Sequence, residues 1–521
     1  MRRYMKVAVI PNLNYKQFIE DFAFLTKKVL ELSPEIKVNE NLFGISYWQL
    51  AYEYEAQITT DMTPFDFFRV AAEFLTSLKG NHLWVTDRLF HAKNQLVASS
   101  NPEDKVKLSY INTLAQNDEI EINHQYHKIL AQKAVTTSRS YIPLVYHEGD
   151  FFNIYPFTVY GTSYLPGTKL QKINNHDVSR ILSNRKNTLN LFDFQKKIFY
   201  SNLSYRIFNN FYTEIPGMLY LEFESEAVPP QAISIDNEKI IMEKRPRNPV
   251  FLFPKTVKFI ESTGILYIRI PVMDINDLDF YLQTIEKEAA HNQVTNIVID
   301  VRYNYGGYDA LWKKILEKII PRKINYKRLY AIKDSIQSIK ILKEYEKTMD
   351  LLNKINPYNE KMYLQKIHNI PSFLENSEFI IWEEDQEINP IKSLLLDVPI
   401  YIITHDIYSS TGNFISMTEH FSNMITVGLP SPIAVGGGLE PTCITLPNSK
   451  IILSLNYSLD ITHSSSYYDT LHRDVDEEVH LSLKDKLAYY SSDIGISEEE
   501  NMKWLLGNDP FFRKVLELIA Q

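Results

Sequence analysis

Cysteine is almost missing from the 521 residues: Cys443 is the only one, so no disulfide can form within the chain. Long apolar runs are missing as well, and no stretch reaches the ~18 residues that a membrane-spanning helix needs. Basic residues are not in surplus, because 55 Lys and Arg stand against 64 Asp and Glu. A nucleic-acid binder usually carries a basic surplus or stripe. The sequence therefore predicts neither nucleic-acid binding nor a membrane span.

The first residues carry no recognisable export signal. The apolar stretch near the start, residues 7–11 (VAVIP), is shorter than the apolar part of a secretory signal, and no cleavage site of small residues follows it. A single cysteine also suits a reducing compartment. Together these features predict a cytoplasmic protein.

The remaining composition is that of a globular protein with several domains. Hydrophobic residues make up 45% of the chain and charged residues 23%, and 521 residues are too many for one hydrophobic core. Near-helical spacing of apolar residues marks the first part of the chain, and short alternating segments mark the middle. Beyond residue 264, buried strands alternate with helices, as in an α/β fold. We predict a helical domain at 1–138, a β-rich domain at 139–250 and an α/β core at 251–521.

Two further parts of the core are predicted to be helical. Residues 325–375 are rich in charge and are predicted as a helical insertion. Residues 498–520 are predicted as one amphipathic helix. No internal repeat or low-complexity tract interrupts the pattern.

A buried strand, a tight turn and a helix span residues 399–421. The strand is PIYIIT, and the turn places Ser409 and Ser410 at the start of the helix. A nucleophilic serine needs an accessible hydroxyl and nearby N–H groups that stabilise an oxyanion, and the first turn of a helix offers unpaired N–H groups. A serine that merely caps the helix would occupy the same position, so this segment alone leaves both interpretations open.

Paired glycines follow a second buried strand. In residues 296–316 the strand NIVIDV leads into Arg302-Tyr-Asn-Tyr and then Gly306-Gly307 before a helix. Glycine pairs allow close backbone approach and unusual dihedral angles, so this segment is a bare turn, a phosphate cradle or an oxyanion loop. A P-loop is not expected, because no Gly-Lys-Ser/Thr follows.

Taken in order, several segments resemble the C-terminal processing peptidase family, which includes tail-specific proteases, the tricorn core and the chlamydial secreted protease. The resemblance covers residues 255–485. The last of its motifs lacks the glycine and proline that the family usually has, and Gly412 replaces an acidic residue after the nucleophile. The segments that carry the resemblance are VIDVRYNYGG at 298–307, YSSTGNF at 408–414, LPNSKI at 446–451 and DVDEEVHL at 474–481.

The resemblance assigns roles to individual residues. The family nucleophile stands four residues before an apolar helix residue, which implies Ser410 with Phe414 rather than Ser409. The implied oxyanion donors are the backbone N–H of Thr411 and that of Gly306 or Gly307.

The resemblance also implies a histidine base. The Ser–Lys branch has its lysine about two dozen residues after the serine, where this chain has Val435 and no lysine nearby. The other branches use a histidine in a Leu-x-Asp-Gly-His segment, which residues 78–84 (LKGNHLW) match through Leu78 and His82. An imidazole with a pKa of ~6.5 accepts a serine proton near neutral pH. Competing histidines are His405, His463 and His472.

A carboxylate that orients the histidine is implied five or six dozen residues after the serine. Asp469 is the preferred candidate, and Asp474 and Asp476 fall in the same zone. Each of the three is equally compatible with a solvated loop charge.

The middle domain resembles a PDZ module. Residues 165–182 (LPGTKLQKINNHDVSRIL) follow the order of a glycine-bearing loop, a strand, a turn and a helix, with Asn175 in place of the usual glycine. Asparagine tolerates the same left-handed backbone. PDZ modules bind chain ends by adding a strand, although a generic hairpin and helix would show the same pattern.

Together the motifs predict an α/β protein with a crotonase/ClpP-like catalytic core, a helical N-terminal region and a PDZ-like β-rich middle domain. The implied function is that of a serine endopeptidase on polypeptide substrates, without metal or cofactor, and self-association as a homo-oligomer is left open. One alternative is a catalytically inactive relative that binds a peptide or an apolar ligand. Another is an acyl-CoA enzyme of the crotonase type, which coenzyme A binding would reveal.

Overall fold

The structure is a computed structural model, and the chain divides into two compact units. Unit 1 comprises residues 1–245 and 441–456, and unit 2 comprises 246–440 and 457–521. The predicted three-domain boundaries stay a prediction. The structure describes residues 9–80, 82–89, 114, 117–137, 142–159, 161–173, 175–182, 191–193, 198–200, 203–204, 220–224, 233–234, 241–242, 254–355, 364–367, 370–374, 378–391, 394, 397–430, 438–439, 441–470, 474–492 and 498–521.

Helices form the first part of unit 1, as predicted. Thr63 caps α4 through a reciprocal pair of hydrogen bonds with Asp66, and Pro64 occupies the first helical position. Inward-facing aromatic rings fill the space between the helices; Phe22 and Phe74, for example, pack edge to face at 5.4 Å. The helices are α1 (Tyr15–Leu32), α2 (Glu35–Phe43), α3 (Tyr47–Glu55), α4 (Pro64–Ser77) and α7 (Asp118–Thr137).

A small antiparallel sheet in unit 1 joins two distant parts of the chain. Its order is β1-β23-β22, with β1 (Trp84–Val85), β22 (Thr442–Thr445) and β23 (Ile452–Leu455). Trp84 pairs with Ser454 and Val85 with Leu453. The sheet therefore fixes the backbone that follows His82 against the strand that follows the LPNSKI motif.

Short antiparallel strands make up the rest of unit 1. They form small sheets with the orders β10-β2-β3, β12-β11-β6-β7, β13-β4-β5 and β8-β9. Asn175 has φ 63 between β6 and β7, which is the left-handed geometry expected of it. The elements are β2 (Leu144–His147), β3 (Asp150–Asn153), β4 (Phe157–Val159), β5 (Thr162–Tyr164), β6 (Leu170–Ile173), β7 (His176–Asp177), α8 (Val178–Leu182), β8 (Leu191–Asp193), β9 (Ile198–Tyr200), β10 (Leu203–Ser204), β11 (Tyr220–Phe223), β12 (Ile233–Ser234) and β13 (Ile241–Met242).

A six-stranded sheet forms the core of unit 2, and its order is β14-β15-β16-β20-β21-β25. Neighbours from β15 to β25 run parallel, and β14 is antiparallel to β15. The strands β15, β16 and β20 are buried at every residue, as expected for parallel strands covered on both faces. The strands are β14 (Thr256–Ile260), β15 (Ile265–Arg269), β16 (Asn296–Asp300), β20 (Ile400–Thr404), β21 (Met424–Gly428) and β25 (Glu477–Glu478).

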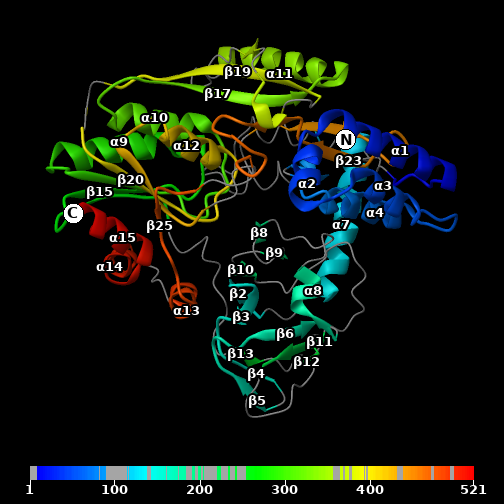
Figure 1. Ribbon diagram of the computed structural model, residues 1–521, viewed down its shortest axis with the longest axis horizontal. Helices are drawn as coiled ribbons and strands as arrows, with labels where there is room; N and C mark the ends of the chain where they lie inside the picture. Colours follow the sequence, from blue (N-terminus) through cyan, green and yellow to red (C-terminus); the bar gives the residue numbers. More distant parts are fainter. Residues whose placement is uncertain are drawn as a thin grey trace, which may run out of the picture. The chain divides into compact units, whose positions relative to one another are not determined.

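Helices cover both faces of this sheet (Figure 1). On one face lie α9 (Leu278–Ala290), which follows the 3-10 turn η2 (Ile275–Asp277), α10 (Asp309–Ile319) and α12 (Ser410–Thr418). The rings of Trp312 in α10 and Phe414 in α12 pack at 5.5 Å. The other face carries α14 (Glu498–Asn508) and α15 (Pro510–Ile519), with α13 (Leu483–Ser491) nearby. The α/β fold predicted for this region is confirmed.

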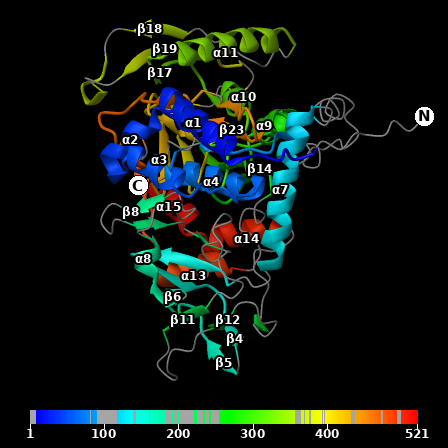
Figure 2. The same cartoon turned by 90° about the vertical axis from the view of Figure 1, so that its right-hand side faces the viewer.

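The expected helical insertion at 325–375 is in part a second sheet, so that prediction was wrong for residues 325–333 and 364–367. Residues 325–333 belong to the long strand β17 (Ile324–Lys333), residues 364–367 form β18, and the sheet has the order β18-β19-β17-β24. Figure 2 shows α11 (Ile336–Ile355) lying along this sheet. The other elements are β18 (Leu364–Ile367), the 3-10 turn η3 (Ser372–Leu374), β19 (Phe379–Ile388) and β24 (Ser458–Asp460).

The predicted single helix at 498–520 is two helices. Asp509 separates them and accepts hydrogen bonds from the backbone N–H groups of Phe511 and Phe512, while Pro510 occupies the first position of α15. Proline has no N–H to continue α14 and fits the first turn of a new helix. Across the ranges that the structure describes, no helix has the length and apolarity required to cross a bilayer.

Candidate active site

Ser410 is the first residue of α12, directly after a strained backbone turn. Ser409 has φ 56 and ψ −129, a region that side chains other than glycine rarely adopt. The Ser410 side chain is buried, at 2% exposure. Its Oγ has no hydrogen-bond partner among the described residues. A buried hydroxyl left unpaired at a helix N-terminus is uncommon in a purely structural serine.

The glycine loop lies against this turn within unit 2. A Cβ added to Gly306 would lie 2.4 Å from the Cβ of Ser409 and 2.9 Å from the backbone N of Ser410. The backbone N–H of Tyr408 donates to the carbonyl of Asn304 at 2.9 Å. The structure thus brings together the predicted glycine loop and the predicted nucleophile turn, and only glycine fits at 306.

The three amides expected to hold an oxyanion differ in their hydrogen bonds. The N–H of Gly306 donates to Oδ1 of Asn304 at 2.8 Å, and the N–H of Thr411 donates to the carbonyl of Tyr408 at 3.2 Å. The N–H of Gly307 has no acceptor within the described part of the chain. Of the three amides, the N–H of Gly307 is therefore the one that can donate to an oxyanion without giving up an existing hydrogen bond.

A buried ionic network anchors the start of the glycine loop. The guanidinium of Arg302, fully buried, donates from Nη2 to Oδ2 of Asp300 and from Nη1 to Oδ2 of Asp509, both at 2.6 Å. Burial opposes ionisation of Asp300, but the charges of Arg302 and Arg269 outweigh it and lower the pKa of Asp300 to about 2. The network ties the end of β16 to the first residue before α15.

His82 lies in unit 1, in the turn after α4, and Ser410 lies in unit 2. The backbone of His82 is left-handed, with φ 53, and its ring lies 4.9 Å from the ring of Trp84. Burial lowers the pKa of His82 to about 4, so the imidazole is neutral at physiological pH. A neutral imidazole is the form that accepts a proton.

A histidine–carboxylate pair that the sequence analysis missed supports this turn. Nδ1 of His124 lies 2.7 Å from Oδ2 of Asp87, and both side chains are buried. The neighbouring Asn123 donates to the carbonyl of Thr86 and accepts from the N–H of Ile452 at 2.9 Å. Because α7 contributes both Asn123 and His124, it holds the segment after His82 in place. The separation of 37 residues between the partners gave no local signal.

The competing histidines have other partners. Nε2 of His405 lies 2.9 Å from the hydroxyl of Tyr490, and burial together with the charges of Arg302 and Lys486 lowers its pKa to about 3. Nε2 of His463 lies 3.2 Å from the carbonyl of Ser416, and its Nδ1 lies 3.2 Å from Glu419. His472 and Val435 lie outside the described residues.

The candidate carboxylates differ in how they are held. Oδ2 of Asp469 accepts from the N–H and the hydroxyl of Ser465, at 2.8 and 2.6 Å, and from the N–H of Ser466 at 2.9 Å. Partial burial acts to raise the pKa of Asp469, but the hydrogen bonds from Ser465 and Ser466 outweigh it, so the pKa is lowered. Oδ2 of Asp476 accepts from the N–H and hydroxyl of Thr426, both at 2.7 Å, which fastens β21 to the residue before β25.

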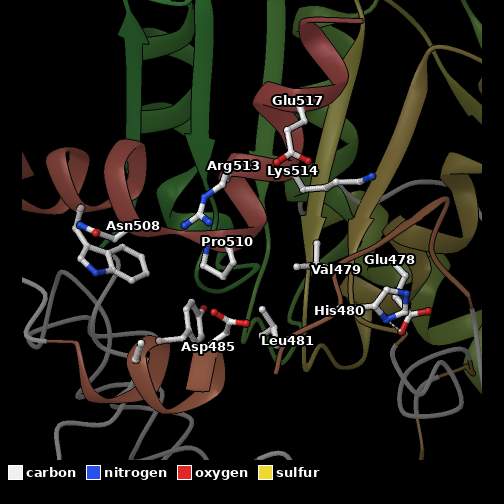
Figure 3. Close-up of a pocket in the computed structure, with 13 residues that line it drawn as sticks. Glu478, Val479, His480, Leu481, Asp485, Asn508, Pro510, Arg513, Lys514 and Glu517 are labelled. Atoms are coloured by element: carbon white, nitrogen blue, oxygen red, sulfur yellow. Dashed lines mark ion pairs between the residues drawn. The ribbon is translucent and has the colours of Figure 1, made fainter. Parts of the chain in front are cut away.

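A cavity of about 480 Å³ lies beside the end of β25, away from the predicted site residues, none of which lines it (Figure 3). Its charged side chains are of both signs, and His480 pairs with Glu478 at 3.5 Å. Within the described ranges, no group of three His, Cys, Asp or Glu side chains is arranged to hold a metal ion. The cavity is lined by Glu478, Val479, His480, Leu481, Asp485, Ala488, Tyr489, Trp504, Asn508, Pro510, Arg513, Lys514 and Glu517.

The sequence and the fold were compared with those of known proteins. Residues 264–430 match the sequence model of peptidase family S41. Mature CPAF superposes with a TM-score of 0.54 at 13% identity over 95% of this chain and 98% of that one, and CPAF complexed with lactacystin gives 0.52 at 13% over 95% and 99%. The photosystem II D1 C-terminal processing protease gives 0.37 at 11% over 92% and 99%. No curated protein matches the sequence significantly.

The matched segment contains both β16 with its glycine loop and β20 with its serine turn. The fold and this match define a serine peptidase. The match over residues 264–430 confirms the resemblance to the C-terminal processing peptidases noted in the sequence.

Substitution of Gly306 by alanine tests the contact between loop and turn. Because the added Cβ would overlap Ser409 and approach the Ser410 backbone, and because φ is +95, we expect Gly306→Ala to slow labelling by a fluorophosphonate probe by about 100-fold. Gly44→Ala is the matched control, since Gly44 has φ +63 but nothing within 4 Å of an added Cβ. The control should lose only about 1–2 kcal/mol of folding stability, because a residue with a Cβ is strained in the left-handed region. It should label at the native rate. Normal labelling of Gly306→Ala would contradict the described packing.

Proposed function

We propose that the chain is a serine endopeptidase that forms an acyl-enzyme on Ser410, with His82 as general base. The observation that carries the proposal is the buried, unpartnered hydroxyl of Ser410 at a helix N-terminus, held against a glycine loop. In the first step Oγ attacks the peptide carbonyl, and its proton passes to an imidazole nitrogen of His82. The imidazole then gives the proton to the leaving amine, and water cleaves the resulting ester by the same route.

The oxyanion is proposed to bind at the glycine loop. The N–H of Gly307 is the first donor, because no acceptor within the described residues uses it. The N–H of Thr411 is the second and would exchange the carbonyl of Tyr408, 3.2 Å away, for the oxyanion. The amide of Gly306 serves the loop itself through Asn304. Such donors contribute about 10²–10³-fold each.

Asp469 is proposed as the carboxylate that orients the His82 imidazole. All three hydrogen bonds that its side chain accepts fall on Oδ2. Oδ1 is left without a partner among the described residues and is available for an imidazole N–H. The lowered pKa of Asp469 keeps the carboxylate ionised, as this role requires.

The fold of the core and the β-rich region of unit 1 are proposed to match a peptidase that acts on polypeptides. The strand order of unit 2 and its covered faces support a crotonase/ClpP-like core. The left-handed Asn175 between β6 and β7, followed by α8, supports a PDZ-like module that binds polypeptide ends. Both features are consistent with cleavage of polypeptides and require no cofactor.

The test of this function is the pH dependence of fluorophosphonate labelling at Ser410. A histidine accepts a proton only while its imidazole is neutral. The imidazole is neutral above the pKa that it has in the folded protein, and this form is lost as the pH falls through that pKa. Because burial sets the pKa of His82 at about 4, we expect the labelling rate to stay constant from pH 8 to about 5.5 and to fall below. Labelling is followed by mass spectrometry of the peptide that contains Ser410.

His82→Ala should abolish this acidic limb and lower the rate by about 10²–10⁴-fold. His463→Ala is the matched control, and it should leave the profile unchanged. A midpoint near pH 6.5 that persists in His82→Ala would assign the base to another histidine. Absence of labelling in folded protein at every pH would favour the inactive, ligand-binding relative.

A further inference from the structure

The nucleophile helix carries a buried amide that is bonded to charged groups at both ends. Asn413 lies on α12 three residues after Ser410 and is 9% exposed. Its Nδ2 donates to Oδ2 of Asp309 at 3.0 Å and to Oδ1 of the same carboxylate at 3.2 Å. Its Oδ1 accepts from Nη2 of Arg328 at 2.7 Å. Hydrogen bonds to charged groups are stronger than those between neutral groups, so this amide is firmly held.

Asp309 connects the amide to the glycine loop. It is the first residue of α10 and stands two residues after Gly307. A carboxylate is favoured at a helix N-terminus. Oδ1 also accepts from Nε1 of Trp312 at 3.3 Å. The carboxylate therefore has a fixed position at the end of the loop.

Arg328 completes the cluster from the neighbouring sheet. Its Nη2 donates to Oδ2 of Asp460 at 3.2 Å, and its Nη1 lies 3.6 Å from Asp309. The guanidinium also lies over the ring of Tyr330, 5.0 Å from the centroid. Asp309 and Asp460 are therefore the direct ion partners of this buried cation, and the cluster is anchored in β17 and β24.

We propose that Asn413 is a positioning residue that locks the nucleophile helix to the oxyanion loop through Asp309. The inference rests on the proposed function of Ser410 and Gly307. The Asn413–Asp309 bonds join the two backbone segments whose spacing sets the distance from nucleophile to oxyanion donor. A misplacement of 1 Å between reacting groups can lower a rate by about 10²-fold. The lock thus acts on the chemical step rather than on substrate binding.

An exchange of the two polar groups tests the lock. Asn413→Asp keeps the acceptor for Arg328 but sets a carboxylate against that of Asp309. We expect the maximal rate of fluorophosphonate labelling to fall about 10–100-fold, with the probe concentration for half-maximal rate changed less than about twofold. Adding Asp309→Asn restores a donor and an acceptor in reversed order, without a change in net charge from the native protein. The double variant should recover to within about threefold of the native rate.

Hydrogen exchange provides a readout that does not need activity. Asn413→Asp should speed amide exchange in both 303–310 and 408–415, and the double variant should restore both segments. Asn12→Asp is the control, since it makes the same chemical change on an exposed side chain. Native labelling in Asn413→Asp, or a double variant as slow as the single one, would overturn the lock. If native protein fails to label, the proposed function fails, and the exchange pattern alone decides whether the lock exists.

Discussion

Replacement of Ser410 by alanine is expected to lower kcat/KM for hydrolysis of fluorescent casein by about 10⁴-fold or more, while the fold is retained. The loss is large because the nucleophile and its base act as a unit, so removal of the hydroxyl removes the acyl-enzyme route entirely. Stability should change little, because the Oγ has no hydrogen-bond partner among the described residues and its removal leaves no group unpaired. Urea unfolding and casein hydrolysis on the same preparation measure both effects.

Ser409→Ala is the matched control for this experiment. Ser409 already carries a Cβ at φ 56, so alanine adds no backbone strain and removes only a hydroxyl one residue away. Activity should stay within about threefold of the native value. Loss of activity in Ser409→Ala with retention in Ser410→Ala would move the nucleophile by one residue.

Of the substitutions described, Arg302→Met is expected to lower the free energy of unfolding the most, by about 3–5 kcal/mol. The substitution preserves much of the side-chain volume but leaves the carboxylates of Asp300 and Asp509 without their main cation in the core. Arg269 still approaches Asp300 at 3.4 Å, so part of the compensation remains on that side. Asp509 caps α15 and has no such substitute, so we expect α15 to loosen first. Urea unfolding followed by circular dichroism measures the loss, and hydrogen exchange locates it.

Arg322→Met provides the comparison, since it removes an exposed arginine from the same unit. Its effect should stay within about 0.5 kcal/mol. Arg302→Lys should fall between the two, because a single ammonium cannot reproduce the forked contacts with two carboxylates. A loss below about 1 kcal/mol for Arg302→Met would contradict the described network.

The α/β core could be predicted from local patterns. Ile297, Ile299 and Ile402 belong to continuous apolar runs, and buried parallel strands read in this way. The helix start at Ser410 was also predictable, because a serine after a buried strand fits a helix N-terminus. The contact between Gly306 and Ser409 was not, since residues a hundred positions apart leave no spacing signal; the family resemblance alone suggested it.

The second sheet was missed for a physical reason. Residues 324–328 alternate between buried and exposed positions, as a half-buried strand should, but one buried position is Arg328, and residues 330–333 are all buried. Its partner across the sheet is Glu384, which is also buried. Charged residues that compensate one another inside the protein look like surface residues in the sequence. Their pairing is visible only once the register of β17 and β19 is known.

The amide lock was hidden in the same way. Asn413 is a weak helix former in the middle of a short helix, and the sequence gives no reason to connect it with Asp309, 104 residues earlier. The two oxyanion amides that already have acceptors could not be predicted either. Local motifs identify candidate residues, whereas the folded structure determines which of them meet and which hydrogen bonds they make.

The single thiol gives unit 1 a unique site for chemical labelling. Cys443 is exposed on β22, whose partner strand β23 also pairs with the strand that follows His82. A maleimide dye would therefore attach at one place, without any cysteine having to be removed first. A second cysteine placed on an exposed position of unit 2, such as Ile336, would make a donor–acceptor pair for energy transfer. Distances between the two dyes, recorded with and without an active-site probe, would show whether the units move during catalysis.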